Sequence, residues 1–249
     1  MYHMLVALQF LTRLPVPRDL NPSDRDMAKS AIFFPAVGVL LGFMAWATFW
    51  GLTFIGFSNT VSIVVVVTLS IFLTGGFHED GLADTFDGLG GAFEKNKKLE
   101  IMKDSRLGTY GALALICAII LRVASLHEIS ENHLLSAMIS SLMFGRLSSN
   151  VLISTTNYVS EQASSKSKPV INGISENSFW LPTSIYSLVA CLFMDITFVC
   201  LLLVMYIVII YALRKFFVKQ IGGITGDILG AVNIIVEIST LLAFTVFYG

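Results

Sequence analysis

The sequence contains little charge. Only 13% of its 249 residues are Asp, Glu, Lys or Arg, whereas about 25% is typical of soluble domains. Hydrophobic residues make up 55%, and the mean hydropathy is +0.78. A chain with so little charge cannot cover a water-facing surface, so most of its surface is expected to face lipid. Because an open strand leaves backbone groups unpaired in lipid, we predict an all-α fold: a polytopic membrane helix bundle in which residues 1–249 form one integral membrane domain.

The sequence also lacks the patterns of a disulfide framework, a zinc site, a basic tail and a signal peptide. The three cysteines, Cys117, Cys191 and Cys200, all lie in apolar stretches, which excludes a disulfide framework or a zinc-binding spacing. The net charge of −1 without a basic tail argues against a nucleic-acid partner. The first residues lack the basic start and small-residue cleavage site of a signal peptide. Residues 4–14 are instead expected to form a short helix at the membrane interface.

Apolar stretches predict about seven transmembrane helices. The run of β-branched residues at 63–67 would suggest a buried strand in a soluble protein, but a helix satisfies the backbone in lipid. Residues 180–213 are too many for one crossing, so we divide this stretch at Asp195. The predicted spans are residues 31–57, 61–77, 109–130, 134–155, two within 180–213, and 228–247.

The lysines and arginines indicate the orientation. Fourteen of the sixteen fall before the first span, between the second and third, after the fourth, or after the sixth. These segments lie on one side if seven spans alternate, and the connections on the other side contain no Lys or Arg. Since basic residues favour the cytoplasmic side, the N-terminus is predicted to be cytoplasmic and the C-terminus external.

The segment between the second and third spans contains the most informative pattern. Residues 78–108 are predicted to form a cytoplasmic acidic and basic active-site loop. Asp80, Asp84 and Asp87 recur at i, i+4 and i+7, which places three carboxylates on one helical face. Like charges at this spacing repel each other, so a cation is expected to neutralise them, and oxygen ligands suit Mg²⁺ or Mn²⁺.

Two alternatives to a metal site exist for this segment. A solvated acidic helix would explain the charges but not the flanking glycines, which permit close backbone approach to a ligand. An EF-hand requires ligands at alternate positions before its glycine, and the spacing here differs. We therefore predict metal ligands at Asp80, Asp84 and Asp87. Asp227 is a further candidate ligand, although its alternative role is to cap the last helix.

Basic residues near the same segment are candidates for binding phosphate. Lys103 and Arg106 lie three residues apart beside small residues, and Arg146 lies within a predicted span. Charges inside spans are costly and usually functional. Arg122, Arg146 and Glu237 could form ion pairs or bind substrate, and these alternatives stay open. His78 is a possible ligand or base, or a solvated side chain.

Four segments in order along the chain resemble the cobalamin synthase family, also called adenosylcobinamide-GDP ribazoletransferase or cobalamin-5'-phosphate synthase. The acidic segment followed by a Met-Lys-Asp-Ser-Arg run is the most specific of them. The resembling segments are Ala7-Leu8-Gln9-Phe10-Leu11-Thr12-Arg13-Leu14-Pro15-Val16-Pro17, residues 78–91, Ile101-Met102-Lys103-Asp104-Ser105-Arg106-Leu107-Gly108 and Gly226-Asp227-Ile228-Leu229-Gly230-Ala231.

The resemblance implies a Mg²⁺-dependent enzyme in a bacterial or archaeal cytoplasmic (inner) membrane. In this reaction a ribose hydroxyl of α-ribazole, or of its 5′-phosphate, attacks the cobinamide-side phosphorus of adenosylcobinamide-GDP, and GMP leaves. Asp80, Asp84, Asp87 and Asp227 would hold Mg²⁺, or Mn²⁺ in its place. Asp87 or Asp84 would serve in catalysis, Asp87 as the base, while Lys103, Arg106 and Arg146 would bind the phosphates.

Two other functions share some of these sequence features. CDP-alcohol phosphotransferases carry a motif similar to Asp-Gly-x-x-Ala-Arg followed by Gly-x-x-x-Asp-x-x-x-Asp. Here the segment 80–84 has Ala at another offset and lacks the Arg. A cation transporter would place its site near the membrane midplane, between internal repeats. The acidic residues here cluster in a predicted cytoplasmic loop instead, and no repeat is apparent.

Overall fold

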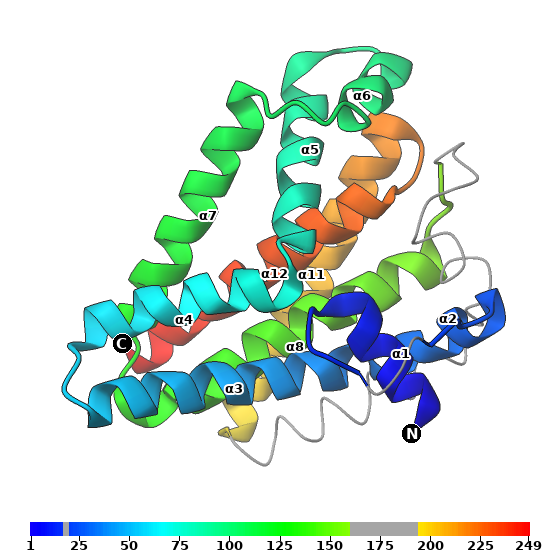
Figure 1. Cartoon of the computed structure of the whole chain (residues 1–249). Helices are drawn as coiled ribbons and strands as arrows, with labels where there is room; N and C mark the ends of the chain where they lie inside the picture. The colour runs from blue at the N-terminus through cyan, green and yellow to red at the C-terminus, as the bar shows by residue number, and fades with distance from the viewer. Residues whose placement is uncertain (17–19, 160–193) are drawn as a thin grey trace.

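The computed structural model describes residues 1–16, 20–159 and 194–249, and these are helical (Figure 1). The described part contains no β-strand, only an isolated bridge between Tyr158 and Ile224. This confirms the predicted all-α class. The helices are α1 (Tyr2–Leu11), α2 (Asp24–Ser30), the 3-10 turn η1 (Ala31–Phe33), α3 (Phe34–Phe54), α4 (Asn59–Thr74), α5 (Phe77–Gly91), α6 (Lys95–Met102), α7 (Thr109–Glu128), α8 (Glu131–Thr155), α11 (Ile196–Ile221) and α12 (Gly226–Tyr248).

Local sequence explains where several helices begin and end. The side chains of Ser58, Asp195 and Thr225 accept hydrogen bonds from backbone N–H groups in the first turns of α4, α11 and α12, as N-cap residues do. α4 ends at Gly75, which adopts a left-handed conformation with φ of +68°. Gly76 follows with φ of +69°, and these two glycines turn the chain by 88° into α5.

The predicted number of seven spans is not confirmed. Four helical segments in the described ranges are long and apolar enough to cross a membrane: Asp24–Phe54, Thr109–Glu128, Ile196–Ile221 and Gly226–Tyr248. A fifth crossing is possible if the bent pair α4 and α5 counts as one. The predicted division at Asp195 matches the start of α11, but this helix runs to Ile221 and so includes Arg214, Lys215 and Lys219. Residues 180–193 lie outside the described residues.

α8 is the helix buried most deeply in the bundle. It was predicted as the fourth span, yet with its serines, Asn150 and Arg146 it is not among the candidate membrane spans of the described residues. α3 and α12 pack against it, as Figure 1 shows. Gly38 and Gly42 bring the α3 backbone against α8, because a Cβ at Gly42 would lie 2.5 Å from the Cα of Ile139. Close approach at small residues is the usual way in which helices associate in membranes.

The two ends of the bundle differ in charge. One end contains the connections that have no Lys or Arg. There Ser130 donates its backbone N–H to the carbonyl of Tyr248 at 2.9 Å, and Asn59 donates to Glu131 at 2.8 Å. At the other end lie Arg13 and the lysines of α6. This asymmetry is the one expected from the basic residues. Which side of a membrane each end faces stays a prediction.

Candidate active site

The acidic segment 78–91 lies on α5, so the region predicted as a loop is largely helical. α5 rises at nearly a right angle to α4 and packs on α12 and α7 (Figure 1). Two glycines allow the contact with α12. A Cβ at Gly81 would lie 2.7 Å from the carbonyl oxygen of Asp227, and one at Gly230 would lie 3.2 Å from that of His78. This close approach brings the acidic face of α5 beside Asp227.

A large open cavity of about 1030 Å³ adjoins this contact. Asp80 and Asp84 line it from α5, and Asp227 lines it from the start of α12. Three of the four predicted metal ligands therefore share one cavity, although they come from segments almost 150 residues apart in the chain. The other charged side chains that line it are those of Arg13, Glu79, Glu100 and Lys103.

The carboxylates perturb one another strongly. The pKa of Asp84 is raised to about 7, mainly by burial and then by the negative charges of Asp80, Asp227 and Asp87. Each of these neighbours makes ionisation of Asp84 less favourable. A carboxyl group titrating near neutral pH inside an open cavity is a common property of functional sites.

The arrangement suits a divalent cation that also binds the substrate. No three His, Cys, Asp or Glu side chains converge closely enough to hold a metal by themselves in residues 1–16, 20–159 and 194–249. Mg²⁺, however, usually takes only one or two protein carboxylates and completes its shell with water and substrate phosphates. Asp80 and Asp227 line the same cavity and could supply two such carboxylates, and a bound cation would lessen the repulsion that raises the pKa of Asp84.

Asp87 has a different environment from the other three aspartates. Its side chain is 7% exposed. Its oxygens accept hydrogen bonds from the backbone N–H groups of Gly108 at 2.7 Å and Gly111 at 2.8 Å. These donors belong to the N-terminus of α7, so Asp87 caps that helix from a neighbouring element. Its predicted roles in metal binding and catalysis stay predictions, and it does not line the open cavity.

The three predicted phosphate-binding cations occupy three different environments. Lys103 lines the cavity. Arg106 is 87% exposed and donates to both carboxylate oxygens of Asp104, with Nε 3.0 Å from each. Arg146 is 1% exposed and lies in the interior of the bundle, away from the lining of the open cavity. The structure therefore brings only Lys103 of this trio together with the aspartates.

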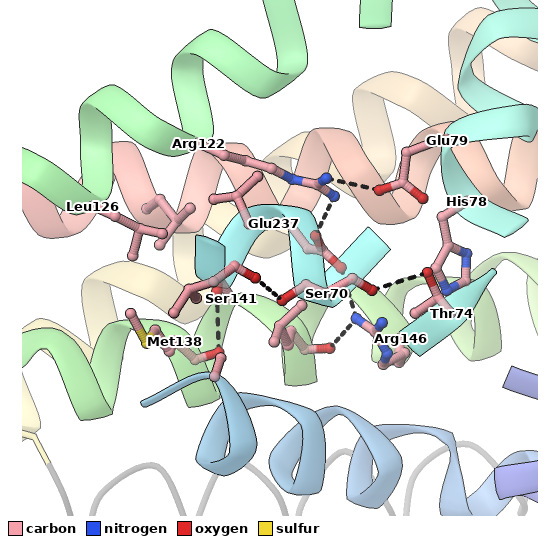
Figure 2. Close-up of a pocket in the computed structure, with 15 residues that line it drawn as sticks. Ser70, Thr74, His78, Glu79, Arg122, Leu126, Met138, Ser141, Arg146 and Glu237 are labelled. Atoms are coloured by element: carbon pink, nitrogen blue, oxygen red, sulfur yellow. Dashed lines mark hydrogen bonds and ion pairs between the residues drawn. The ribbon is translucent and has the colours of Figure 1, made fainter. Parts of the chain in front are cut away.

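The interior charges form a chain of ion pairs, which Figure 2 shows. Arg146 donates to Glu237 at 2.6 Å, Glu237 accepts from Arg122 at 2.6 Å, and Arg122 donates to Glu79 at 2.8 Å. Of the two alternatives left open for the charges within spans, the structure shows pairing. The chain links α8, α12, α7 and α5, and it surrounds a small inner cavity of about 50 Å³. Glu79 lines both this inner cavity and the open one.

Sequence reasoning did not identify Arg13 or Glu79 as site residues. Arg13 was counted only among the basic residues before the first span. Its position within the first resembling segment was the one available signal. Glu79 adjoins Asp80, but its partner Arg122 is 43 residues away, so nothing local in the sequence reveals the pair.

Comparison with known proteins identifies the family. The family model described as cobalamin-5-phosphate synthase matches residues 3–245. The chain belongs to this family. It is 37% identical to a Shewanella amazonensis protein over 98% of this chain and 95% of that relative. It is 39% identical to one from Shewanella piezotolerans (94% and 91%) and 36% identical to one from Vibrio cholerae (98% and 93%). All three relatives are named adenosylcobinamide-GDP ribazoletransferase. No solved structure matches the chain.

The cavity is where the four resembling segments meet in this cobalamin-5-phosphate synthase family member. Arg13 comes from the first segment, Asp80 and Asp84 from the second, Lys103 from the third and Asp227 from the fourth. Segments spread over most of the chain thus contribute charged side chains to one space. This convergence locates the candidate active site independently of the charge pattern within any one segment.

Proposed function

We propose that this chain is an adenosylcobinamide-GDP ribazoletransferase of a bacterial or archaeal cytoplasmic membrane. The ribose hydroxyl of α-ribazole, or of its 5′-phosphate, forms a bond to the cobinamide-side phosphorus. The bond from that phosphorus to the GMP oxygen breaks, GMP leaves, and the hydroxyl proton passes to a base. Family membership and the names of the relatives support this transferase activity. The comparisons favour neither a CDP-alcohol phosphotransferase nor a cation transporter.

The observation that carries the proposal is the meeting of Asp80, Asp84 and Asp227 with cationic side chains in one open cavity. Asp80 and Asp227 would hold a Mg²⁺ ion, for which Mn²⁺ could substitute. When bound, this ion would neutralise the diphosphate and the charge that develops on the leaving GMP. Lys103 would hold phosphate oxygens from the α6 side of the cavity.

Asp84 is the better placed of the two aspartates predicted to act in catalysis. It lines the cavity, where its carboxylate can accept the hydroxyl proton. The oxygens of Asp87 are engaged with Gly108 and Gly111. We therefore assign proton transfer to Asp84, and we assign to Asp87 the task of holding α7 against α5.

The basic end of the bundle supports the proposed orientation. Arg13 and Lys103 line the cavity itself, and the lysines of α6 lie beside it. The positive-inside tendency then supports a cytoplasmic location for the cavity, the side on which nucleotide substrates are available.

The test is turnover by purified protein in detergent, supplied with adenosylcobinamide-GDP, α-ribazole and Mg²⁺. We expect GMP and a cobalamin product in equal amounts, and loss of both with EDTA. Because no sealed membrane is present, turnover also rules out transport as the explanation. The Asp80→Asn variant is the matched inactive control. Absence of product from folded protein, or full rates in excess EDTA, would overturn the activity or the metal requirement respectively.

A further inference from the structure

Arg13 lies at the turn between α4 and α5, beside the acidic face. It follows the end of α1, and its backbone N–H donates to the carbonyl of Leu73 at 2.6 Å. Its side chain lines the open cavity together with Asp80 and Asp227. The N-terminal segment therefore contributes a cation to a site whose carboxylates come from the middle and the end of the chain.

Gly75 leaves room for the Arg13 side chain. A Cβ added at Gly75 would overlap the Arg13 Nε and would lie 3.1 Å from its Cγ and 3.2 Å from its Cζ. Absence of a side chain at residue 75 thus provides the space that Arg13 occupies. The guanidinium also lies at the C-terminal end of α4, where the helix dipole favours a positive charge.

Within residues 1–16, 20–159 and 194–249, the Arg13 guanidinium donates to no hydrogen-bond acceptor. Arg106, Arg122 and Arg146 each bind a carboxylate. Arg214 donates to a backbone carbonyl and to a hydroxyl group. Arg13 stands close to an acidic site yet forms none of these ion pairs. A planar group with five N–H donors is therefore available to an incoming ligand.

The charges that line the cavity indicate which side chains can bind a phosphate group there. Asp80, Asp84 and Asp227 oppose the approach of any anion, and Glu79 and Glu100 add to this effect. Among the described residues that line the cavity, Arg13 and Lys103 are the only arginine and lysine. Arginine binds phosphate oxygens bidentately, with shorter and stronger hydrogen bonds than neutral donors make.

Arg13 and Lys103 reach the acidic face from opposite ends of α5. Arg13 contacts Gly75, just before α5 begins, whereas the last turn of α6 packs on Gly88, where a Cβ would lie 2.5 Å from Met102. From its start to Gly88, α5 rises roughly 16 Å. The Arg13 end is the one at which Gly81 touches Asp227, so Arg13 lies at the end of α5 that carries the proposed metal ligand Asp80 and meets Asp227.

We propose that Arg13 is a substrate-binding residue that holds the diphosphate of the nucleotide-activated substrate at the Asp80–Asp227 end of the cavity. This inference rests on the proposed transferase function and adds a residue to it. The competing explanation is that Arg13 only anchors the N-terminal segment to the end of α4. An anchor would affect stability, whereas a diphosphate ligand would affect one substrate and not the other.

Steady-state kinetics with each substrate varied in turn distinguishes these explanations. For Arg13→Ala we expect the KM for adenosylcobinamide-GDP to rise about 10- to 150-fold, the range for losing a charge-assisted hydrogen bond. The KM for α-ribazole should stay within about twofold. Arg13→Lys should restore only part of the loss, because a point charge does not reproduce the bidentate contact. Arg25→Ala is the control, since Arg25 is exposed on α2 and lies outside the cavity lining.

A matched glycine pair tests the placement of Arg13 without altering it. Gly75 and Gly76 have nearly equal φ angles of +68° and +69°, but a Cβ at Gly76 would meet nothing within 4 Å. Backbone strain from Gly75→Ala and Gly76→Ala should therefore be similar. Only the first displaces Arg13, so we expect the larger rise in the KM for adenosylcobinamide-GDP with Gly75→Ala. Equal changes would count against the inference.

Direct binding separates failure of this inference from failure of the proposed function. Binding of GDP in the presence of Mg²⁺, followed by calorimetry, does not need turnover. Weaker binding to Arg13→Ala than to Arg25→Ala supports the Arg13 assignment even if the wild type forms no cobalamin product, a result that would overturn only the proposed reaction. Unchanged GDP binding and unchanged KM values in a folded Arg13→Ala or Arg13→Gln protein would overturn the inference.

Discussion

Glu237 is the carboxylate shared by two buried arginines, and its neutralisation should destabilise the bundle strongly. It accepts from Arg122 and from Arg146, each at 2.6 Å, and it is only 3% exposed. Two arginines and two glutamates, Glu79 included, balance each other's charge in this cluster. Glu237→Gln keeps the shape of the side chain but leaves the cluster with one excess positive charge.

The size of the effect follows from what each arginine retains. Arg122 keeps Glu79 at 2.8 Å, whereas Arg146 keeps only the carbonyl of Leu142 at 3.0 Å. One buried cation, not two, is therefore left without a carboxylate. Breaking a single buried ion pair costs about 3–5 kcal/mol, and we expect a loss of this size in the free energy of unfolding.

Two double variants test whether the geometry, and not simply the net charge, sets this cost. Both Glu237→Gln with Arg146→Met and Glu237→Gln with Arg122→Met return the cluster to zero formal charge. The first leaves Arg122 paired with Glu79 and should recover most of the lost stability, because replacing a whole buried pair is often neutral. The second separates Glu79 and Arg146 from their partners and should be at least as unstable as Glu237→Gln alone.

The measurement is unfolding of purified protein in mixed micelles, by SDS titration and by heating, at equal detergent concentrations. Recovery in only the first double variant would confirm the pairing pattern. Equal stability of the two double variants, or no loss in Glu237→Gln, would refute the reasoning that this cluster is a buried and specifically paired network.

Three further predictions concern the cavity and its orientation. The rate should fall as the pH drops through a midpoint at or below about 7, because protonated Asp84 cannot accept a proton. Raising Mg²⁺ should move this midpoint to lower pH, and pH–rate profiles showing no such shift would separate Asp84 from the metal. Asp87→Ala should lower the free energy of unfolding by about 3 kcal/mol or more, since two charge-assisted bonds at 2.7 and 2.8 Å are lost. Unchanged SDS unfolding would contradict its capping role. Single cysteines at Lys97 and Gly249 in a cysteine-free background should label from opposite sides of intact cells, the first from the cytoplasm; labelling from one side would contradict the predicted topology.

The fold class was predictable from the sequence because it depends on composition. Low charge and long apolar stretches require a lipid-facing surface, and lipid requires backbone groups to be paired within helices. The number of crossings was harder to predict. α8 has the length of a span, yet it carries Ser140, Ser141 and Asn150 in the interior. Burial between α3 and α12 tolerates polar groups that lipid would not, and hydropathy along the chain cannot distinguish these two environments.

The candidate site was predictable only in part. The i, i+4, i+7 spacing correctly placed three aspartates on one helix, because helical periodicity is local. It did not separate Asp87 from the other two. That difference arises from Gly108 and Gly111, which reach Asp87 from α7. Asp227 was identified as a candidate from its glycine-rich surroundings, and the contact of Gly81 with the start of α12 places it in the cavity.

The sequence by itself determined that the chain is a helical membrane protein, that its acidic residues recur on a helical face, and that its segments resemble one enzyme family. Each of these depends on composition or on neighbours within a few residues. Only the tertiary structure decided which cations face the acids: Arg13 and Lys103 line the cavity, while Arg146 is neutralised by Glu237 in the interior. The physical reason is that helix packing determines which side chains become partners. Contacts such as those of Glu237 with Arg146 and Arg122, 91 and 115 positions away, leave no mark on the local sequence pattern.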